Sequence, residues 1–103
     1  MTQGRFMVTV ASAGQPPVVA VEGDVDLANV GEFETAMAKA RNGSPELTVD
    51  LTGVGYCDSS AVRALFALAA TTKLTMIVSS TGHITTLLGI SGLDRVAAMV
   101  IKD

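Results

Sequence analysis

The chain has 103 residues, of which 49% are hydrophobic, 4% are aromatic and 17% are charged, with a formal net charge of −3. A chain of this length is expected to form one domain and to bury roughly two-thirds of the surface that its unfolded form exposes. The negative charge, together with the lack of a lysine or arginine cluster and of any tryptophan, argues against a nucleic-acid partner, which needs a cationic or stacking surface.

Two strands are predicted at the start of the chain. Residues 6–11 alternate weakly between apolar and polar side chains, as is typical of an edge strand. Pro16 and Pro17 then indicate a turn, because proline does not fit a regular ladder. Residues 18–21 form a continuous apolar run rich in β-branched side chains, which is typical of a strand buried on both faces.

The first helix is predicted to follow these strands. Asn29 precedes Glu32 by three residues, which is a spacing close to that of a capping box. We therefore expect Asn29 to cap the helix and Gly43 to end it. Its apolar residues recur at helical spacing: Val30, Phe33, Met37 and Ala40.

The rest of the chain alternates between strand and helix patterns, with glycine near several of the element ends. In chain order these elements are a strand at 47–51, a helix at 61–70, a strand at 73–79, a short helix from Ser80 or Thr81 to Leu88, and a strand at 96–101.

The order of elements predicts an α/β fold with a mixed sheet. Connections of the observed lengths join parallel strands, whereas the turn at Pro16 and Pro17 allows an antiparallel first pair. We expect a single small domain over residues 1–103, with four or five strands and with helices packed mainly on one face of the sheet.

Asp58, Ser59 and Ser60 lie between the strand at 47–51 and the helix at 61–70. The free N–H groups and the positive dipole end of a helix start favour an oxygen atom or an anion there. The serines could simply cap the helix, because serine is a preferred cap. A serine phosphate is also tolerated at this position, so the site could instead be a switch.

Three segments together resemble the STAS domain of bacterial anti-sigma-factor antagonists, and the resemblance spans nearly the whole chain. They are residues 21–26, 49–60 and 87–94. The Asp-Ser-Ser stretch that ends the second segment is the most specific part of the match. The resemblance implies a mixed sheet of four or five strands with helices packed against it.

The resemblance also implies a partner-switching cycle in transcription regulation. The unmodified antagonist binds an anti-sigma factor that is a serine kinase, and so releases a sigma factor. The kinase phosphorylates the antagonist, the complex dissociates, and a serine phosphatase resets the cycle. The implied acceptor is Ser60, and Ser59 is the less favoured alternative. Asp26 is implied to lie near the acceptor.

We expect the partner-binding surface to surround the serines. The helix at 61–70 is apolar on nearly every side, which complete burial would explain. In so small a domain, however, its first turn could stay exposed as an apolar docking patch. The expected partner contacts are Asp24, Asp26, Asp58, Ser59, Ser60, Ala61, Val62 and Ala64.

Several positions depart from the family pattern or invite other roles. Ala61 stands where glycine is usual, which should strengthen the first helical turn. Gly82 stands where many members have proline, and we expect no further helix after the last strand. Tyr56 and the single cysteine, Cys57, are predicted core residues, and His83 is a predicted surface residue.

No enzymatic activity is expected. Asp24 and Asp26 could form a two-carboxylate site, but no acidic or histidine cluster has the spacing of metal ligands. We therefore expect no metal and no cofactor. The alternative function, from a different class, is a small STAS subunit that regulates the ATPase of a lipid-transporting ABC system.

The location of the protein is also predicted. The N-terminal residues lack the apolar stretch of a signal peptide, and no run approaches the roughly 18 apolar residues of a membrane span. We expect a cytoplasmic protein without membrane insertion, present as a monomer or a weak homodimer.

Overall fold

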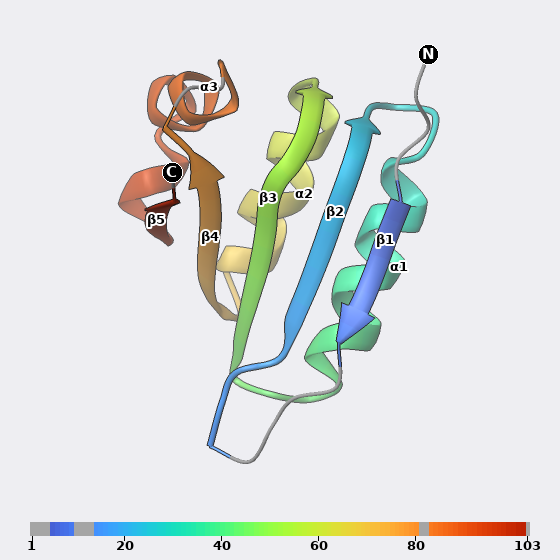
Figure 1. Cartoon of the computed structure of the whole chain (residues 1–103). Helices are drawn as coiled ribbons and strands as arrows, with labels where there is room; N and C mark the ends of the chain where they lie inside the picture. The colour runs from blue at the N-terminus through green and yellow to red at the C-terminus, as the bar shows by residue number, and fades with distance from the viewer. Residues whose placement is uncertain (1–4, 10–13, 81–82, 103) are drawn as a thin grey trace.

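The computed structural model describes residues 5–9, 14–80 and 83–102 as a five-stranded sheet with helices packed against it (Figure 1). The elements are β1 (Arg5–Thr9), β2 (Val18–Val25), α1 (Val30–Arg41), β3 (Glu46–Cys57), α2 (Ser59–Ala69), β4 (Lys73–Ser79), α3 (His83–Ser91), the 3-10 helix η1 (Leu93–Arg95) and β5 (Ala98–Lys102).

The strands lie in the sheet in their chain order, β1-β2-β3-β4-β5. β1 is antiparallel to β2, and every later neighbouring pair is parallel. Each parallel pair is joined by a helical connection, as chain connectivity requires. The predicted mixed α/β sheet is therefore confirmed.

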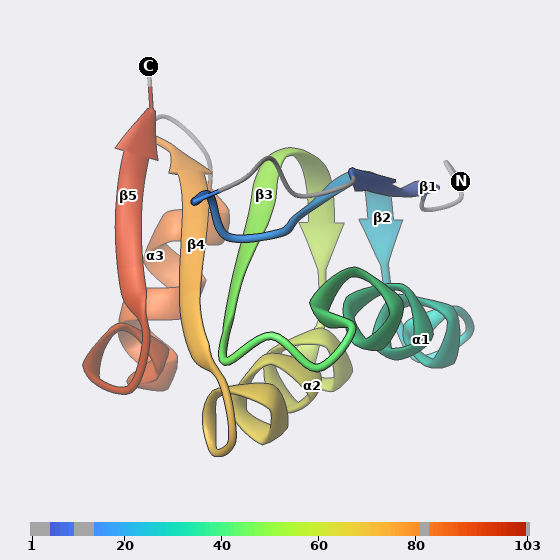
Figure 2. The same ribbon diagram turned by 90° about the horizontal axis from the view of Figure 1, so that it is seen from below.

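One face of the sheet, here called the inner face, packs against the helices (Figure 2). Val19 on β2, Val49 on β3 and Met76 on β4 are register partners on this face, and each is fully buried. Val18 and Ala20 alternate with Val19 and are only half-buried on the opposite, open face. The prediction that residues 18–21 are buried on both faces is wrong, because no helix of the described chain covers the open face.

α1 packs its apolar side on β1 and β2. Phe33 and Met37 are buried, and the Phe33 ring stacks on Phe6 of β1 with 5.7 Å between ring centroids. Asn29 occupies the N-cap position, but its side chain makes no cap hydrogen bond, so the predicted capping box is wrong. The helix ends at Arg41, and its C-cap is Asn42 in the left-handed conformation, one residue before the predicted Gly43.

The element ends differ from those expected. β3 runs six residues beyond the predicted end at Leu51, as far as Cys57, because the pairing with β2 continues through two irregularities. Of the two residues expected to start the last helix, Ser80 lies in a turn, Thr81 lies outside the described residues, and the helix begins at His83. Residues 10 and 11 of the first predicted strand also lie outside the described part of the chain.

Gly53 occupies a close approach between β3 and β2. It pairs with Glu22, directly after a register shift that follows Ala20. A Cβ atom built on Gly53 would lie 2.9 Å from Cγ of Glu22 and 3.1 Å from the backbone oxygen of Val21. Gly31 in α1 offers the opposite case, because no atom outside its chain neighbours and the surrounding helix backbone lies within 4 Å of a Cβ placed there.

We predict that Gly53→Ala lowers the free energy of unfolding by about 1–3 kcal/mol, because the added methyl group overpacks the β2–β3 contact. Gly31→Ala is the matched control and should raise this free energy by about 0.5–1 kcal/mol, since alanine is the better helix former. Urea unfolding monitored by circular dichroism measures both. Equal stability of the two variants would contradict the assigned register.

Candidate functional site

The candidate site forms where β2 and β3 end side by side. Val18 pairs with Thr48 but Val25 pairs with Cys57, so β3 accommodates two more residues than β2 over this stretch. The last residues of the two strands are therefore level, and the backbone N–H of Asp58 donates to the carbonyl oxygen of Val25 at 3.2 Å. The β2–α1 loop and the start of α2 thus share one edge of the sheet (Figure 1).

The carboxylate of Asp58 connects these two segments. Its Oδ1 atom accepts hydrogen bonds from the backbone N–H of Ser60 at 2.9 Å, from the backbone N–H of Ala61 at 3.4 Å and from the Ser60 hydroxyl. Its Oδ2 atom accepts from the backbone N–H of Leu27 at 3.1 Å, across 31 residues of chain. Asp58 is therefore both the N-cap of α2 and a link to the β2–α1 loop.

These hydrogen bonds lower the pKa of Asp58 below its usual value. The hydroxyl of Ser60 makes the largest contribution, and the backbone N–H groups of Ser60, Leu27 and Ala61 add to it, while desolvation opposes them. Each donor stabilises the charged form of the carboxylate. Asp58 is consequently ionised at neutral pH.

The β2–α1 loop has its own hydrogen bonds. The side chain of Asn29 accepts from the N–H of Asp26 at 2.9 Å and donates to the carbonyl oxygen of Asp24 at 2.8 Å. The carboxylate of Asp26 accepts from the N–H of Ala28 at 3.0 Å. Asn29, expected to cap the helix, instead braces the loop that precedes it.

The structure separates the roles of the two serines. Ser59 is exposed, whereas Ser60 is half-buried with its hydroxyl donating to Asp58. Because Asp58 supplies the N-cap, neither serine side chain is needed for that role. The alternative in which the serines cap α2 is therefore wrong, because Asp58 is the cap.

The predicted apolar docking patch is wrong. Ala61, Val62 and Ala64 are 2%, 8% and 7% exposed, because they belong to the hydrophobic core. The exposed apolar side chains on the two segments that form the site are instead Leu27 of the β2–α1 loop, at 76%, and Tyr56 near the end of β3, at 50%. Sequence reasoning missed Leu27 as a site residue, and no spacing signal marks it.

The placement of Tyr56 and of the acidic residues follows from the register. Tyr56 was expected in the core, but it lies on an exposed stretch of β3 and pairs with Asp24. Asp24 is half-buried, and its carboxylate lies over Gly55 of β3. The structure therefore brings Asp24, Asp26 and Asp58 to the same edge of the sheet.

Other reactive side chains do not join this site. Cys57 is buried as predicted, and burial, followed by the charge of Asp58, raises the pKa of its thiol to about 11. His83 is exposed at the start of α3, as expected. Over residues 5–9, 14–80 and 83–102, no group of three or more histidine, cysteine or acidic side chains could hold a metal ion.

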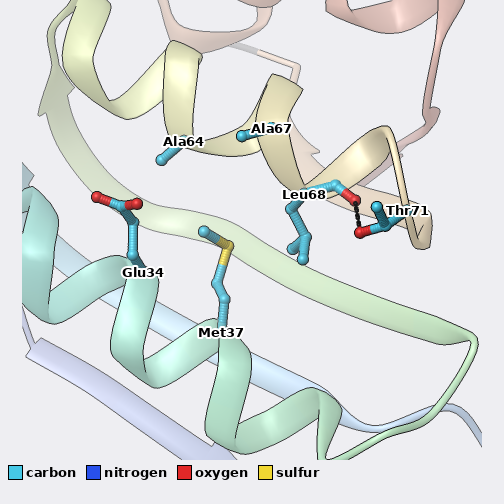
Figure 3. A pocket seen from close by; sticks show the side chains of 6 residues that line it. All are labelled: Glu34, Met37, Ala64, Ala67, Leu68 and Thr71. Atoms are coloured by element: carbon cyan, nitrogen blue, oxygen red, sulfur yellow. Dashed lines mark hydrogen bonds between the residues drawn. The ribbon is translucent and has the colours of Figure 1, made fainter.

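A separate open groove lies between α1 and α2 (Figure 3). Ala64 and Leu68 of α2 face Met37 of α1 across it, and Glu34 stands at its edge. Glu34 is the charged residue among its six lining residues, so the groove holds no acid–base pair.

In the described part of the chain, no helix is long and apolar enough to cross a membrane.

The fold and the site define a small α/β domain whose distinguishing feature is a hydroxyl group at a helix start beside an acidic loop. A protein-family model described as "Mlab, STAS domain" matches residues 8–101 of the sequence. The chain therefore belongs to the STAS-domain family. None of the curated proteins matches the sequence.

Solved structures share the fold at low sequence identity. An anti-sigma-factor antagonist from Mycobacterium paratuberculosis is similar with a TM-score of 0.83 and 20% identity, over 95% of this chain and 86% of that one. A putative anti-sigma-factor antagonist from Thermotoga maritima has a TM-score of 0.74 and 14% sequence identity, over 95% of this chain and 86% of that one. The anti-sigma-factor antagonist SpoIIAA in its unphosphorylated form has a TM-score of 0.62 and 12% sequence identity, over 96% of this chain and 88% of that one.

We predict that Asp58→Ala lowers the free energy of unfolding by about 1–2 kcal/mol at pH 7, because α2 loses its cap. The lowered pKa means that the folded state favours the carboxylate. This stabilisation is complete above the unfolded pKa, near 3.9, and is lost as the pH falls through the folded pKa. The difference from wild type should therefore shrink below about pH 4.

The matched control for this variant is Asp94→Ala, at an exposed acidic residue of η1. It should change the free energy of unfolding by less than about 0.5 kcal/mol, both at pH 7 and below about pH 4. Urea unfolding at a series of pH values measures both variants. An Asp58→Ala effect that does not change with pH would contradict the charged cap.

We predict that Cys57 in the folded protein reacts with iodoacetamide at pH 8 more than about a hundredfold more slowly than in urea, because its raised pKa leaves little thiolate and burial blocks access. Mass spectrometry over time measures the alkylated fraction. Rapid alkylation without denaturant would show that the thiol is accessible.

Proposed function

We propose that this protein is an anti-sigma-factor antagonist, a binding module that is itself a kinase substrate and not an enzyme. The observation that carries the proposal is the hydroxyl of Ser60, held at the start of α2 against Asp58. The similarity of the fold to structures of anti-sigma-factor antagonists supports it.

The proposed partner is an anti-sigma factor of the serine-kinase type. Its docking surface would include Asp24, Asp26, Asp58, Ser59 and Ser60, as expected from the sequence. We add Tyr56, because it is exposed and tyrosine is enriched in binding hot spots. We also add Leu27, because its side chain is exposed and its backbone N–H contacts the carboxylate of Asp58. The buried Ala61, Val62 and Ala64 would support this surface from below without touching the partner.

The proposed modification is phosphoryl transfer from ATP, bound by the kinase, to Ser60. A bond forms between the serine Oγ and the γ-phosphorus, and the bond from that phosphorus to the bridging oxygen breaks. ADP leaves, and the hydroxyl proton passes to a base of the kinase or to solvent. A phosphatase reverses the modification by hydrolysis. We propose a cytoplasmic location, because the proposed cycle uses ATP and an anti-sigma factor.

A phosphate on Ser60 would weaken the complex through its charge. Phosphoserine carries about −1.5 to −2 charges at neutral pH, and the carboxylate of Asp58 already contacts Ser60. A partner surface shaped for a neutral hydroxyl then meets repulsion and a desolvation penalty. A loss of about 3 kcal/mol would lower the affinity roughly a hundredfold.

The test is incubation with candidate kinase-type anti-sigma factors and Mg-ATP, followed by intact-mass measurement and site mapping. We expect one added phosphate in wild type and in Ser59→Ala, and none in Ser60→Ala. Phosphate on Ser59 alone would move the acceptor to the neighbouring serine. No binding and no modification by any such kinase would overturn the proposed function.

The effect on affinity is tested separately with Ser60→Asp. We expect this variant to bind the anti-sigma factor about a hundredfold more weakly than wild type, because the new charge stands where the partner meets a hydroxyl. Ser59→Asp serves as the matched control and should have a smaller effect. Isothermal titration calorimetry measures the affinities, and unchanged binding by Ser60→Asp would contradict a charge-based switch.

A second candidate is the STAS subunit of a lipid-transporting ABC system, which would regulate its ATPase. The observation that favours it is the matching family model, whose description names Mlab and not an anti-sigma-factor antagonist. A pull-down that recovers a transporter ATPase and no kinase-type anti-sigma factor would select this second function.

A further inference from the structure

We propose that Asp58 couples the state of Ser60 to the β2–α1 loop, so that a phosphate on Ser60 detaches Asp58 from the N–H of Leu27. This inference rests on the proposed phosphorylation of Ser60 and describes its structural effect. The switch would then change the shape of the docking surface as well as its charge.

The first step concerns the hydroxyl of Ser60. In the unmodified protein this hydroxyl is a donor to Oδ1 of Asp58, which also accepts from the backbone N–H groups of Ser60 and Ala61. A phosphate ester at Oγ has no hydroxyl proton at this position. The interaction between the two side chains therefore changes from a hydrogen bond to a repulsion between anions.

The second step is competition for the start of α2. A phosphate on the second helical residue can accept hydrogen bonds from the same free N–H groups and is favoured by the helix dipole. Those N–H groups now bind Oδ1 of Asp58. Since the phosphate satisfies the donors and repels the carboxylate, Asp58 loses its contacts on the α2 side.

The third step transmits the change to Leu27. The N–H of Leu27 donates to the other oxygen of the same carboxylate, at 3.1 Å. When the carboxylate turns away, this N–H loses its acceptor. The neighbouring residues keep theirs, because the N–H of Ala28 donates to the carboxylate of Asp26 and the side chain of Asn29 holds the loop base.

The released segment is therefore short and carries an exposed apolar side chain. Leu27 is 76% exposed, so its side chain has no place in the core that would hold it. In the proposed complex Leu27 is an apolar contact of the partner. Its release would weaken binding in addition to the charge of the phosphate.

The test measures amide hydrogen exchange by NMR in protein with phosphoserine installed at residue 60 during translation. We expect the Leu27 amide to exchange at least about tenfold faster than in unmodified protein, which corresponds to about 1.4 kcal/mol. The Ala28 amide is the internal control and should change little. Phosphoserine installed at residue 59 is the matched control and should leave Leu27 protected.

Two variants separate the contribution of the Asp58 carboxylate to the protection of the Leu27 amide from that of the Ser60 hydroxyl. Asp58→Ala should expose the Leu27 amide without any phosphate, whereas Ser60→Ala removes only the hydroxyl and should leave Leu27 protected. The phosphoserine measurement does not depend on whether Asp58→Ala folds. Unchanged Leu27 exchange and chemical shift in the phosphoserine protein would overturn the inference.

The test is independent of the proposed function, because no kinase installs the phosphate. Modification of Ser60 by a kinase together with an unchanged Leu27 amide would overturn the coupling alone. Release of Leu27 in the phosphoserine protein, together with no binding and no modification by any kinase-type anti-sigma factor, would support the coupling and overturn the proposed function alone.

Discussion

The parallel pairing of β2 with β3 is the contact on which both the core and the candidate site depend. The side chains on the inner face of the two strands pack against the helices. The C-terminal ends of the same strands carry the site. The pairing shifts at two places, so that Val25 and Cys57 become level. Asp58 is thereby placed beside the end of β2, where its second oxygen meets Leu27. Without these shifts Asp58 would be a helix cap with no link to the loop.

That link makes the start of α2 and the β2–α1 loop one hydrogen-bonded unit. An N-cap needs only one oxygen for the first turn of its helix, and Oδ1 of Asp58 meets this need. Oδ2 is left for Leu27. A charge placed on Ser60 therefore acts on a group that also holds the neighbouring loop. In a docking surface built from both segments, a local modification can alter contacts some distance from the modified atom.

Particular elements show why the sequence predicted some features and not others. β4 matched its expected range because its alternating apolar residues face a core on one side only. β3 was expected to end at Leu51 because Gly53 and Gly55 usually indicate turns. Both are instead strand residues, and at Gly53 the backbone of β2 comes too close for a side chain. Such a close approach depends on a neighbour about thirty residues away.

The sequence alone determined the order of strands and helices and the position of Ser60 at a helix start, because periodicity and capping chemistry are local. Only the tertiary structure decided which side of α2 is buried, so that Ala61 lies in the core while Leu27 is exposed. It also decided that Asn29 braces its loop and that Asp58 reaches Leu27. These features depend on strand register and helix rotation, which arise from packing between segments that are distant in the chain.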